Sequence, residues 1–307
     1  MASLAHNRPI FATRVAARFL LKVAAQRNSR RLCITERTHA VNIRRFLSLA
    51  TLTLLGGAAL DLHAEPKTSA PSASALPTIV LVHGAFADGS SWDRVVPLLR
   101  AKGYSVVALH QPLSSLADDV AAARRAIDAQ PGDVVLVGHS YGGAVITEAG
   151  NNPKVKSLVY VAAFGPDANE SINDLGRGKA PPVWITSLRV DSGGYGWLPE
   201  STVLHDFAQD LPAAEASIVA TKQGPIFLKN FDEKIKLAAW HSRPVFYLRA
   251  SEDHMIDPAA QELMATRMHA TLTSIPASHV PMISRPKDVA KVILAAAEAR
   301  RPPVAQH

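Results

Sequence analysis

Short, wholly apolar runs rich in β-branched residues recur along residues 78–298, and each is followed by a segment with helical spacing. Such runs are typical of strands buried on both faces of a parallel sheet, and apolar residues three and four positions apart predict the covering helices. The predicted strands are TIVLVHG (78–84), YSVVALH (104–110), DVVLVG (133–138), VKSLVYVAA (155–163), PVFYLRA (244–250) and ATLTSIPA (270–277). The predicted helices are SSWDRVVPLLRAKG (90–103), SSLADDVAAARRAIDAQ (114–130), GGAVITEAG (142–150), PAAQELMATRM (258–268) and a closing helix over 286–300. This alternation predicts an α/β fold with a mostly parallel, doubly wound sheet.

The alternation is interrupted between about residues 165 and 241, a stretch rich in glycine, proline and tryptophan. It includes one helix-like segment, LPAAEASIVATKQ (211–223). A stretch of this length between two core strands is typical of a cap over the carboxyl edge of the sheet, where open α/β sheets bind ligands. We therefore expect one domain over residues 78–307, with a helical cap inserted before the strand at 244–250.

The N-terminal segment has a different hydropathy pattern. Arg44 and Arg45 precede a mostly apolar run over 46–60, and the small residue Ala64 follows. That order is typical of a secretory signal peptide, and the run is shorter than the roughly 20 residues that span a bilayer. We expect a signal peptide ending near Ala64, a flexible Pro/Ser/Ala linker over 65–77, and a periplasmic or secreted protein without stable membrane association. An uncleaved N-terminal membrane anchor is the alternative.

The formal net charge of +7 belongs to the same N-terminal segment. Residues 1–64 hold ten of the 33 Lys and Arg and two of the 26 Asp and Glu, which leaves 23 basic and 24 acidic side chains in residues 65–307. This near-neutral balance argues against nucleic-acid binding. The one cysteine, Cys33, also precedes the predicted domain. The domain therefore has no disulfide, no thiolate nucleophile and no cysteine-based metal site.

Residues 138–142, GHSYG, match the pattern G-x-S-x-G between a predicted strand and a predicted helix. In that context the serine occupies a strained turn that lifts its hydroxyl clear of the sheet. A Cβ at Gly138 or Gly142 would collide with neighbouring backbone. Ser140 is therefore predicted to be a nucleophile.

A serine hydroxyl needs a base and an orienting acid, which in this arrangement follow the serine in the order acid, then histidine. The acid is expected in the loop after the strand at 244–250, where Glu252, Asp253 and Asp257 lie. Asp253 is favoured because it lies three residues beyond the strand. Asp257 precedes a proline, which suits the start of the next helix.

The base is expected in the loop after the last predicted strand, where His279 lies. From that loop a histidine can reach the serine. His241, His254 and His269 are the alternatives; two of them fall on or beside helix or cap segments, and His254 adjoins the predicted acid.

Backbone amides must also stabilise the oxyanion of the intermediate. The amide after the nucleophile, that of Tyr141, is one expected donor. The other is expected from the loop HGAF after the first strand, where Gly84 leaves the backbone free to approach the substrate oxygen. The amide of Ala85 is favoured there, with Phe86 second, and His83 is expected to be structural.

The segments VLVHGAFADGSSWDRVVPLLRAKGYSVVALHQP, VVLVGHSYGG, LVYVAAFGPD and ASHVPMIS are similar to those of the α/β-hydrolase superfamily. They resemble in particular the branch that holds bacterial esterases, plant methyl-ester esterases and hydroxynitrile lyases, over essentially all of 78–298. This resemblance implies the fold described above. It also implies Ser140 as nucleophile, Asp253 as acid, His279 as base, and Ala85 with Tyr141 as the oxyanion hole.

Within this branch the lyases typically carry a threonine in place of Gly84 and use a cap lysine. Gly84 favours hydrolysis, although Lys234 and Lys236 lie near the end of the cap. The expected function is therefore hydrolysis of small-molecule carboxylic esters without a cofactor. A lactonase or amidase would use the same residues, and a hydroxynitrile lyase or a non-catalytic ligand-binding homologue are further alternatives.

Aromatic residues near the predicted site indicate an apolar pocket. Those expected to contact the substrate are Phe86, Trp92, Phe164 and Trp184, while Tyr195, Trp197 and Trp240 also lie in the cap. Several of these aromatics are expected simply to pack the cap onto the core. No group of residues in 78–307 has the spacing of a zinc site, so no metal is expected.

Overall fold

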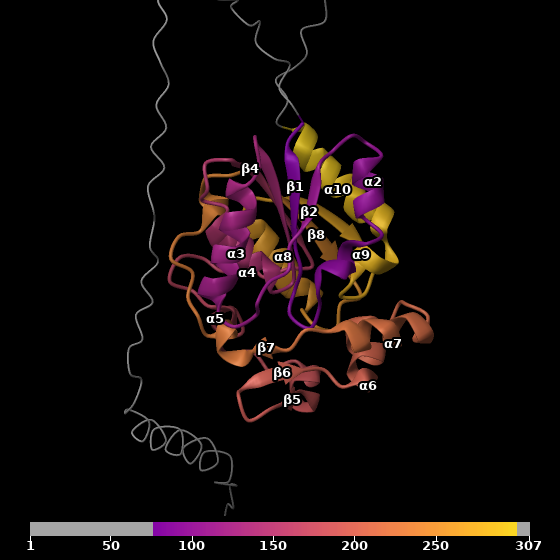
Figure 1. Cartoon of the computed structure of the whole chain (residues 1–307). Coiled ribbons are helices and arrows are strands. Elements are labelled where there is room, and N and C mark those ends of the chain that lie inside the picture. Colours follow the sequence, from indigo (N-terminus) through magenta and orange to yellow (C-terminus); the bar gives the residue numbers. More distant parts are fainter. Residues whose placement is uncertain (1–75, 300–307) are drawn as a thin grey trace, which may run out of the picture. The chain divides into compact units, whose positions relative to one another are not determined.

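A computed structural model describes residues 76–299, so the predictions for the signal peptide and for most of the linker lie outside the described residues. One six-stranded sheet forms the centre of the domain (Figure 1). Its strands are β1 (Thr78–Val82), β2 (Val106–Ala108), β3 (Val134–His139), β4 (Val155–Val161), β8 (Val245–Ala250) and β9 (Thr271–Ile275). The order is β2-β1-β3-β4-β8-β9, and every neighbouring pair is parallel. All six strands were predicted, and the α/β fold is confirmed.

Helices cover both faces of the sheet (Figure 1). One face carries α2 (Val96–Arg100) and α10 (Pro286–Glu298), and the other carries α3 (Leu116–Asp128), α4 (Gly142–Ala149) and α8 (Pro258–Arg267). The side chain of Ser115 accepts the Asp118 amide and starts α3, and the side chain of Asp257 starts α8 in the same way. For Asp257 this is the role that the sequence indicated.

The predicted helix over 90–103 is broken into two pieces. Asp88 caps a short 3-10 helix, η1 (Gly89–Trp92), and α2 starts only at Val96, just before Pro97. Proline lacks the amide hydrogen that a helix interior needs, so it is accommodated in a first turn. The helical periodicity was correct, but the proline divides the segment.

The segment between β4 and β8 forms a cap of short elements at one end of the sheet (Figure 1). Its helical and turn elements are α5 (Ile172–Leu175), η2 (Val183–Ser187), α6 (Glu200–Thr202), η3 (Val203–Phe207), α7 (Ala213–Lys222), η4 (Leu228–Phe231) and η5 (Ala239–His241). It also holds an antiparallel sheet, β5-β6-β7, formed by β5 (Arg189–Val190), β6 (Tyr195–Trp197) and β7 (Ile226–Phe227). The cap is thus mixed rather than purely helical. Strands of two or three residues are too short to show a periodic pattern.

The arrangement of the strands determines where a site can form. In the sheet, β1 has β2 on one side and β3 on the other. The chain therefore passes from β1 to β2 in one direction across the sheet, and from β3 to β4 in the opposite direction. The loops after these two strands therefore diverge at the carboxyl edge, which is the usual position of a ligand site in such sheets. All residues of β1 and β3 are buried, so the loops start from a rigid base. Within residues 76–299, no helix combines the length and the apolar character needed to cross a bilayer.

Candidate active site

Ser140 occupies the sharp turn between β3 and α4. Its φ is 51°, in the left-handed region that costs a non-glycine residue about 1–3 kcal/mol. A Cβ on Gly138 would lie 2.6 Å from the carbonyl oxygen of Gly142, and a Cβ on Gly142 would lie 2.6 Å from that of His83. The steric prediction for these two glycines is confirmed, and the turn presents the serine at the edge of the sheet that the cap covers.

The structure brings together the serine, the histidine and the favoured carboxylate. Nε2 of His279 lies 2.8 Å from Oγ of Ser140, and Nδ1 of His279 lies 2.8 Å from Oδ2 of Asp253. Asp253 belongs to the loop after β8, and His279 lies between β9 and α9 (Pro281–Ser284). All three residues are buried, each with at most 6% of its surface exposed.

Four donors fix the carboxylate of Asp253. Its Oδ1 accepts the amides of Met255 at 2.7 Å and Ile256 at 3.0 Å, and its Oδ2 accepts Nε2 of Gln261 at 2.8 Å in addition to His279. An ionised carboxylate accepts only, so Nδ1 of His279 carries the proton in this arrangement. The lone pair on Nε2 then faces the hydroxyl of Ser140. Gln261 was not predicted from the sequence, although it lies on the first turns of the helix that follows the acid.

The other candidates for acid and base lie elsewhere. Asp257 accepts the amide of Ala259 at the start of α8, and Glu252 is exposed. The three alternative histidines are all exposed: His241 pairs with Asp167, His254 with Asp206, and His269 follows the end of α8. Residues 76–299 contain no group of three or more side chains of the metal-ligating types that could hold an ion.

The loop after β1 packs directly against Ser140. A Cβ on Gly84 would lie 2.7 Å from Cβ of Ser140, and Phe86 adopts a positive φ of 58° that turns the chain back. Within the described residues, neither the amide of Ala85 nor that of Tyr141 donates a hydrogen bond to another protein group. Two unpartnered amides therefore flank the serine, in the residues expected to form an oxyanion hole.

Two buried histidines, His83 and His139, lie beside the site. Nδ1 of His83 donates to the Gly84 carbonyl at 2.9 Å while its Nε2 accepts the amide of Gln111 at 3.1 Å. Nε2 of His139 donates to the carbonyl of His279 at 2.7 Å, and the two rings lie 4.8 Å apart. Burial is the main cause that lowers the pKa of His83 and that of His139. The contacts of His83 join the loop after β1 to Gln111, whereas the support that His139 gives to His279 was not predicted.

The predicted substrate-contacting aromatics occupy three different environments. Phe86 and Trp184 form an edge-to-face pair with centroids 6.0 Å apart, and Nε1 of Trp184 donates to the carbonyl of Met255. Phe164 is partly buried, and its amide donates to the carbonyl of Ser140 at 3.1 Å. Trp92, in contrast, has no exposed surface and packs in the core. Packing accounts for Trp92 without a ligand, whereas the other three residues lie beside the serine or the acid loop.

The cap contacts the loops that carry the acid and the base. The ring of Phe207 packs against the ring of His279 with centroids 5.2 Å apart. Nε2 of Gln209 donates to the carbonyl of Glu252 at 2.6 Å, and Oδ2 of Asp210 accepts the amide of Ser278 at 3.0 Å. One short cap segment therefore holds both loops.

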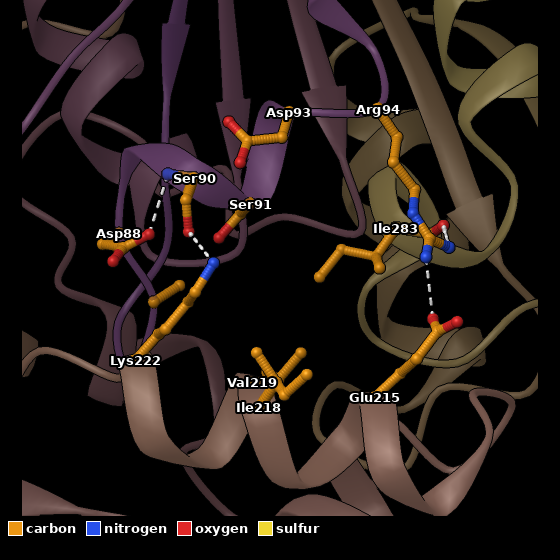
Figure 2. Close-up of a pocket in the computed structure, with 11 residues that line it drawn as sticks. Asp88, Ser90, Ser91, Asp93, Arg94, Glu215, Ile218, Val219, Lys222 and Ile283 are labelled. Atoms are coloured by element: carbon orange, nitrogen blue, oxygen red, sulfur yellow. Dashed lines mark hydrogen bonds and ion pairs between the residues drawn. The ribbon is translucent and has the colours of Figure 1, made fainter.

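A separate cleft of about 170 Å³ lies where α7 faces η1 and α9 (Figure 2). At one end of the cleft, Arg94 forms an ion pair with Glu215 at 2.8 Å (Figure 2). At the other end, Nζ of Lys222 lies 3.4 Å from Oγ of Ser90 (Figure 2). Ser140, Asp253 and His279 are not among its lining residues. The cleft marks the seam between cap and core rather than the site of the serine.

Comparison with known proteins covers the whole of the sheet and cap. The model of the alpha/beta hydrolase family matches residues 79–292. A probable hydrolase R7 from Phoma sp. is 28% identical over 243 residues, covering 71% of this chain and 96% of the relative. A pyrethroid hydrolase from Sphingobium wenxiniae is 28% identical over 256 residues, covering 72% and 88% respectively. Methylesterase 8 from Arabidopsis thaliana is 27% identical over 248 residues, covering 71% and 89%.

Solved structures agree on the fold. A pyrethroid hydrolase from Sphingobium faniae superposes with a TM-score of 0.64 at 24% identity, covering 74% of this chain and 99% of the other. Polyneuridine aldehyde esterase gives a TM-score of 0.64 at 20% identity, covering 72% and 99%.

Proposed function

The chain belongs to the α/β-hydrolase family, and from that premise we propose that it hydrolyses carboxylic esters of small apolar substrates through an acyl-enzyme on Ser140. One observation carries the proposal. Two contacts of 2.8 Å join the hydroxyl of Ser140, the ring of His279 and the carboxylate of Asp253, and the serine sits in a strained turn at the edge of the sheet. A hydroxyl, a base and an orienting acid in this order are the parts that acyl transfer requires.

In the first half-reaction, Oγ of Ser140 attacks the carbonyl carbon of the ester while Nε2 of His279 takes its proton. Asp253 holds Nδ1–H and stabilises the imidazolium that forms. The carbonyl oxygen becomes negatively charged in the tetrahedral intermediate. The unpartnered amides of Ala85 and Tyr141 are the donors for this oxyanion, and each such donor contributes about 3–4 kcal/mol to lowering the barrier.

The intermediate collapses when the bond from carbon to the alcohol oxygen breaks, and His279 returns the proton to the departing alcohol. Water then attacks the acyl group on Ser140, with the same histidine as base, and releases the acid. Apart from the substrate and this water, no step of the sequence needs a group that the chain does not supply. The proposal therefore includes no cofactor.

The apolar character of the substrate is inferred from the aromatic pair of Phe86 and Trp184. Phe86 follows directly on the oxyanion residue Ala85, so a substrate held by that amide would meet the pair. The relatives support the same bond class, since they include a pyrethroid hydrolase, a carbendazim hydrolyzing esterase and methylesterases. Lys234 and Lys236, which a lyase would place near the serine, are both exposed.

Turnover of p-nitrophenyl acetate by the purified protein tests the proposal, with Ser140→Ala as the decisive variant. Wild type should release p-nitrophenol, with one equivalent bound as acyl-enzyme when deacylation is slow. Ser140→Ala should keep less than about a thousandth of this turnover, because residual catalysis without the nucleophile is small. Ser157→Ala is a matched control, since it removes another buried serine hydroxyl, one that donates to the Ala296 carbonyl. Retained activity in Ser140→Ala, or cyanide release from a cyanohydrin with no ester turnover, would overturn the proposal.

A further inference from the structure

The side chain of Tyr141 ends in a buried polar network contributed by three different elements. Its ring has no exposed surface, and its hydroxyl donates to Oδ2 of Asp119 on α3 at 2.6 Å. Nδ2 of Asn230, in the cap element η4, lies 3.2 Å from the same hydroxyl and 3.4 Å from Oδ2 of Asp119. The ring of Phe231 packs edge-on against Tyr141 with centroids 5.8 Å apart. The residue that follows the nucleophile is thus anchored to both the core and the cap.

The hydrogen bonds in this network all run toward one acceptor. Asn230 donates to the oxygen of Tyr141, Tyr141 donates to Asp119, and the amide of Leu113 donates to Oδ1 of Asp119 at 2.8 Å. Asp119 has no exposed surface, and among residues 76–299 it has no basic partner in a hydrogen bond or an ion pair. A buried carboxylate without such donors is costly, so each bond of the network supports the others.

A second contact ties the same cap segment to Leu113, the residue whose amide donates to Asp119. Leu113, whose amide Asp119 holds, has a positive φ of 55°, and its carbonyl accepts the amide of Phe227 in β7 at 2.9 Å. Phe227 and Asn230 lie three residues apart at the junction of β7 and η4. The cap segment 226–231 therefore docks on this part of the core through two contacts: the Phe227 amide donates to the carbonyl of Leu113, and the Asn230 side chain reaches Tyr141 and Asp119.

We propose that Asp119 and Asn230 are positioning residues that set the oxyanion-hole amide of Tyr141 and couple its placement to the docking of the cap. The amide and the phenol belong to one residue, so holding the ring at its far end fixes the backbone beside Ser140. In this design the oxyanion hole is complete only when η4 is seated on the core. The kinetic part of this inference rests on the proposed function, whereas the coupling of cap and turn does not.

The kinetic test is Tyr141→Phe, which keeps the ring and its packing and removes the hydroxyl. Loss of one oxyanion donor lowers kcat by about 10²–10³-fold, so a donor that is displaced rather than removed should lower kcat by about 10-fold. KM should change by less than about 2-fold. Tyr160→Phe is the matched control, because it removes another fully buried tyrosine hydroxyl, one bonded to Oγ1 of Thr147 at 2.8 Å. A merely structural role predicts that both variants lose thermal stability and neither loses kcat.

The coupling test is hydrogen exchange by mass spectrometry on peptides covering 134–149. Asn230→Ala should raise the exchange of the amides in the turn and the first turn of α4 by at least about 5-fold. Glu215→Gln, which breaks the Arg94–Glu215 ion pair between cap and core but touches no member of the network, should leave those amides unchanged. Asn230→Ala should also lower kcat, as Tyr141→Phe does.

The outcomes separate the two proposals. If wild type hydrolyses no ester, the proposed function fails, and the exchange experiment still decides the coupling. If wild type hydrolyses esters while Tyr141→Phe keeps full kcat, the positioning role is overturned and the proposed function stands. Equal exchange in Asn230→Ala and Glu215→Gln overturns the link between cap and oxyanion hole.

Discussion

Replacing Asp253 by asparagine changes one oxygen into an amino group at the point where four donors converge. In wild type the amides of Met255 and Ile256 face Oδ1, and Gln261 with His279 face Oδ2. The new NH₂ group has to occupy one of these two positions. Either choice sets donor against donor, because every partner of this carboxylate donates a hydrogen bond.

The two orientations differ in cost. With NH₂ at the Oδ1 position, two backbone amides lose their acceptor, at about 1–3 kcal/mol each. With NH₂ at the Oδ2 position only one N–H of Gln261 loses its acceptor, since its Nε2 still donates to the carbonyl of Ile256 and the ring of His279 can switch its proton from Nδ1 to Nε2. The second orientation is thus favoured by about 1–3 kcal/mol, or roughly 5- to 150-fold. It places N–H rather than a lone pair toward Ser140, so His279 can no longer act as a base.

The expected loss in kcat/KM is therefore about 10³–10⁴-fold, since the wrong tautomer is compounded by loss of the charge that stabilises the imidazolium. The free energy of unfolding should fall by about 1–3 kcal/mol, the cost of the one donor left without an acceptor. Both are measured with p-nitrophenyl acetate and by urea denaturation. Asp257→Asn is the control in the same loop: asparagine caps a helix as well as aspartate does, so activity and stability should stay near wild type. If Asp253→Asn keeps more than about a tenth of the activity, the reasoning about the tautomer is wrong.

Four further predictions follow from particular contacts. Gly84→Ala should abolish ester hydrolysis, because its Cβ would lie 2.7 Å from Cβ of Ser140, whereas Gly132→Ala, with nothing within 4 Å, should remain active in the same assay. Burial raises the pKa of Asp119 to about 6. Between about pH 6 and 4 the folded state therefore binds a proton that the unfolded state does not bind. As the pH falls from 7 to 4.5, the free energy of unfolding of the wild type should rise by about 2 kcal/mol relative to that of Asp119→Asn, as measured by denaturation. Activity should be unchanged after dialysis against EDTA, and a loss that added metal restores would contradict this. N-terminal sequencing of exported protein should begin just after Ala64; an intact leader on soluble cytoplasmic protein would exclude export, and one on membrane-bound protein would favour the anchor.

The sheet was predictable because its strands are buried on both faces. Uninterrupted apolar runs such as 78–82 and 134–138 have few other interpretations when helical segments separate them. The chain order of parallel strands then assigns each loop to one edge of the sheet. That is why Ser140, Asp253 and His279 could be singled out although they lie up to 139 residues apart in the chain.

The cap and the support of the site were less accessible. The strands β5, β6 and β7 have two or three residues each, and nothing in their sequence distinguishes them from loop. Asn230 and Tyr141 are 89 residues apart, and no local pattern pairs them. A signal did exist for Asp119, because it follows Leu116 by three residues and precedes Ala123 by four, on the apolar face of α3. A charged residue in such a stripe requires buried partners.

The position of the cap segments explains why a site built on a rigid sheet still depends on an inserted segment. The sheet fixes the starting points of the loops, but the acid and the base lie three and four residues beyond their strands. Over that distance the chain is held by contacts from the cap: Gln209 on the carbonyl of Glu252 and Asp210 on the amide of Ser278. The cap makes a further contact of this kind beside the serine, because Asn230 in η4 donates to the hydroxyl of Tyr141. Changes in the cap should therefore alter kcat as well as KM, because Gln209 and Asp210 hold the loops that carry Asp253 and His279.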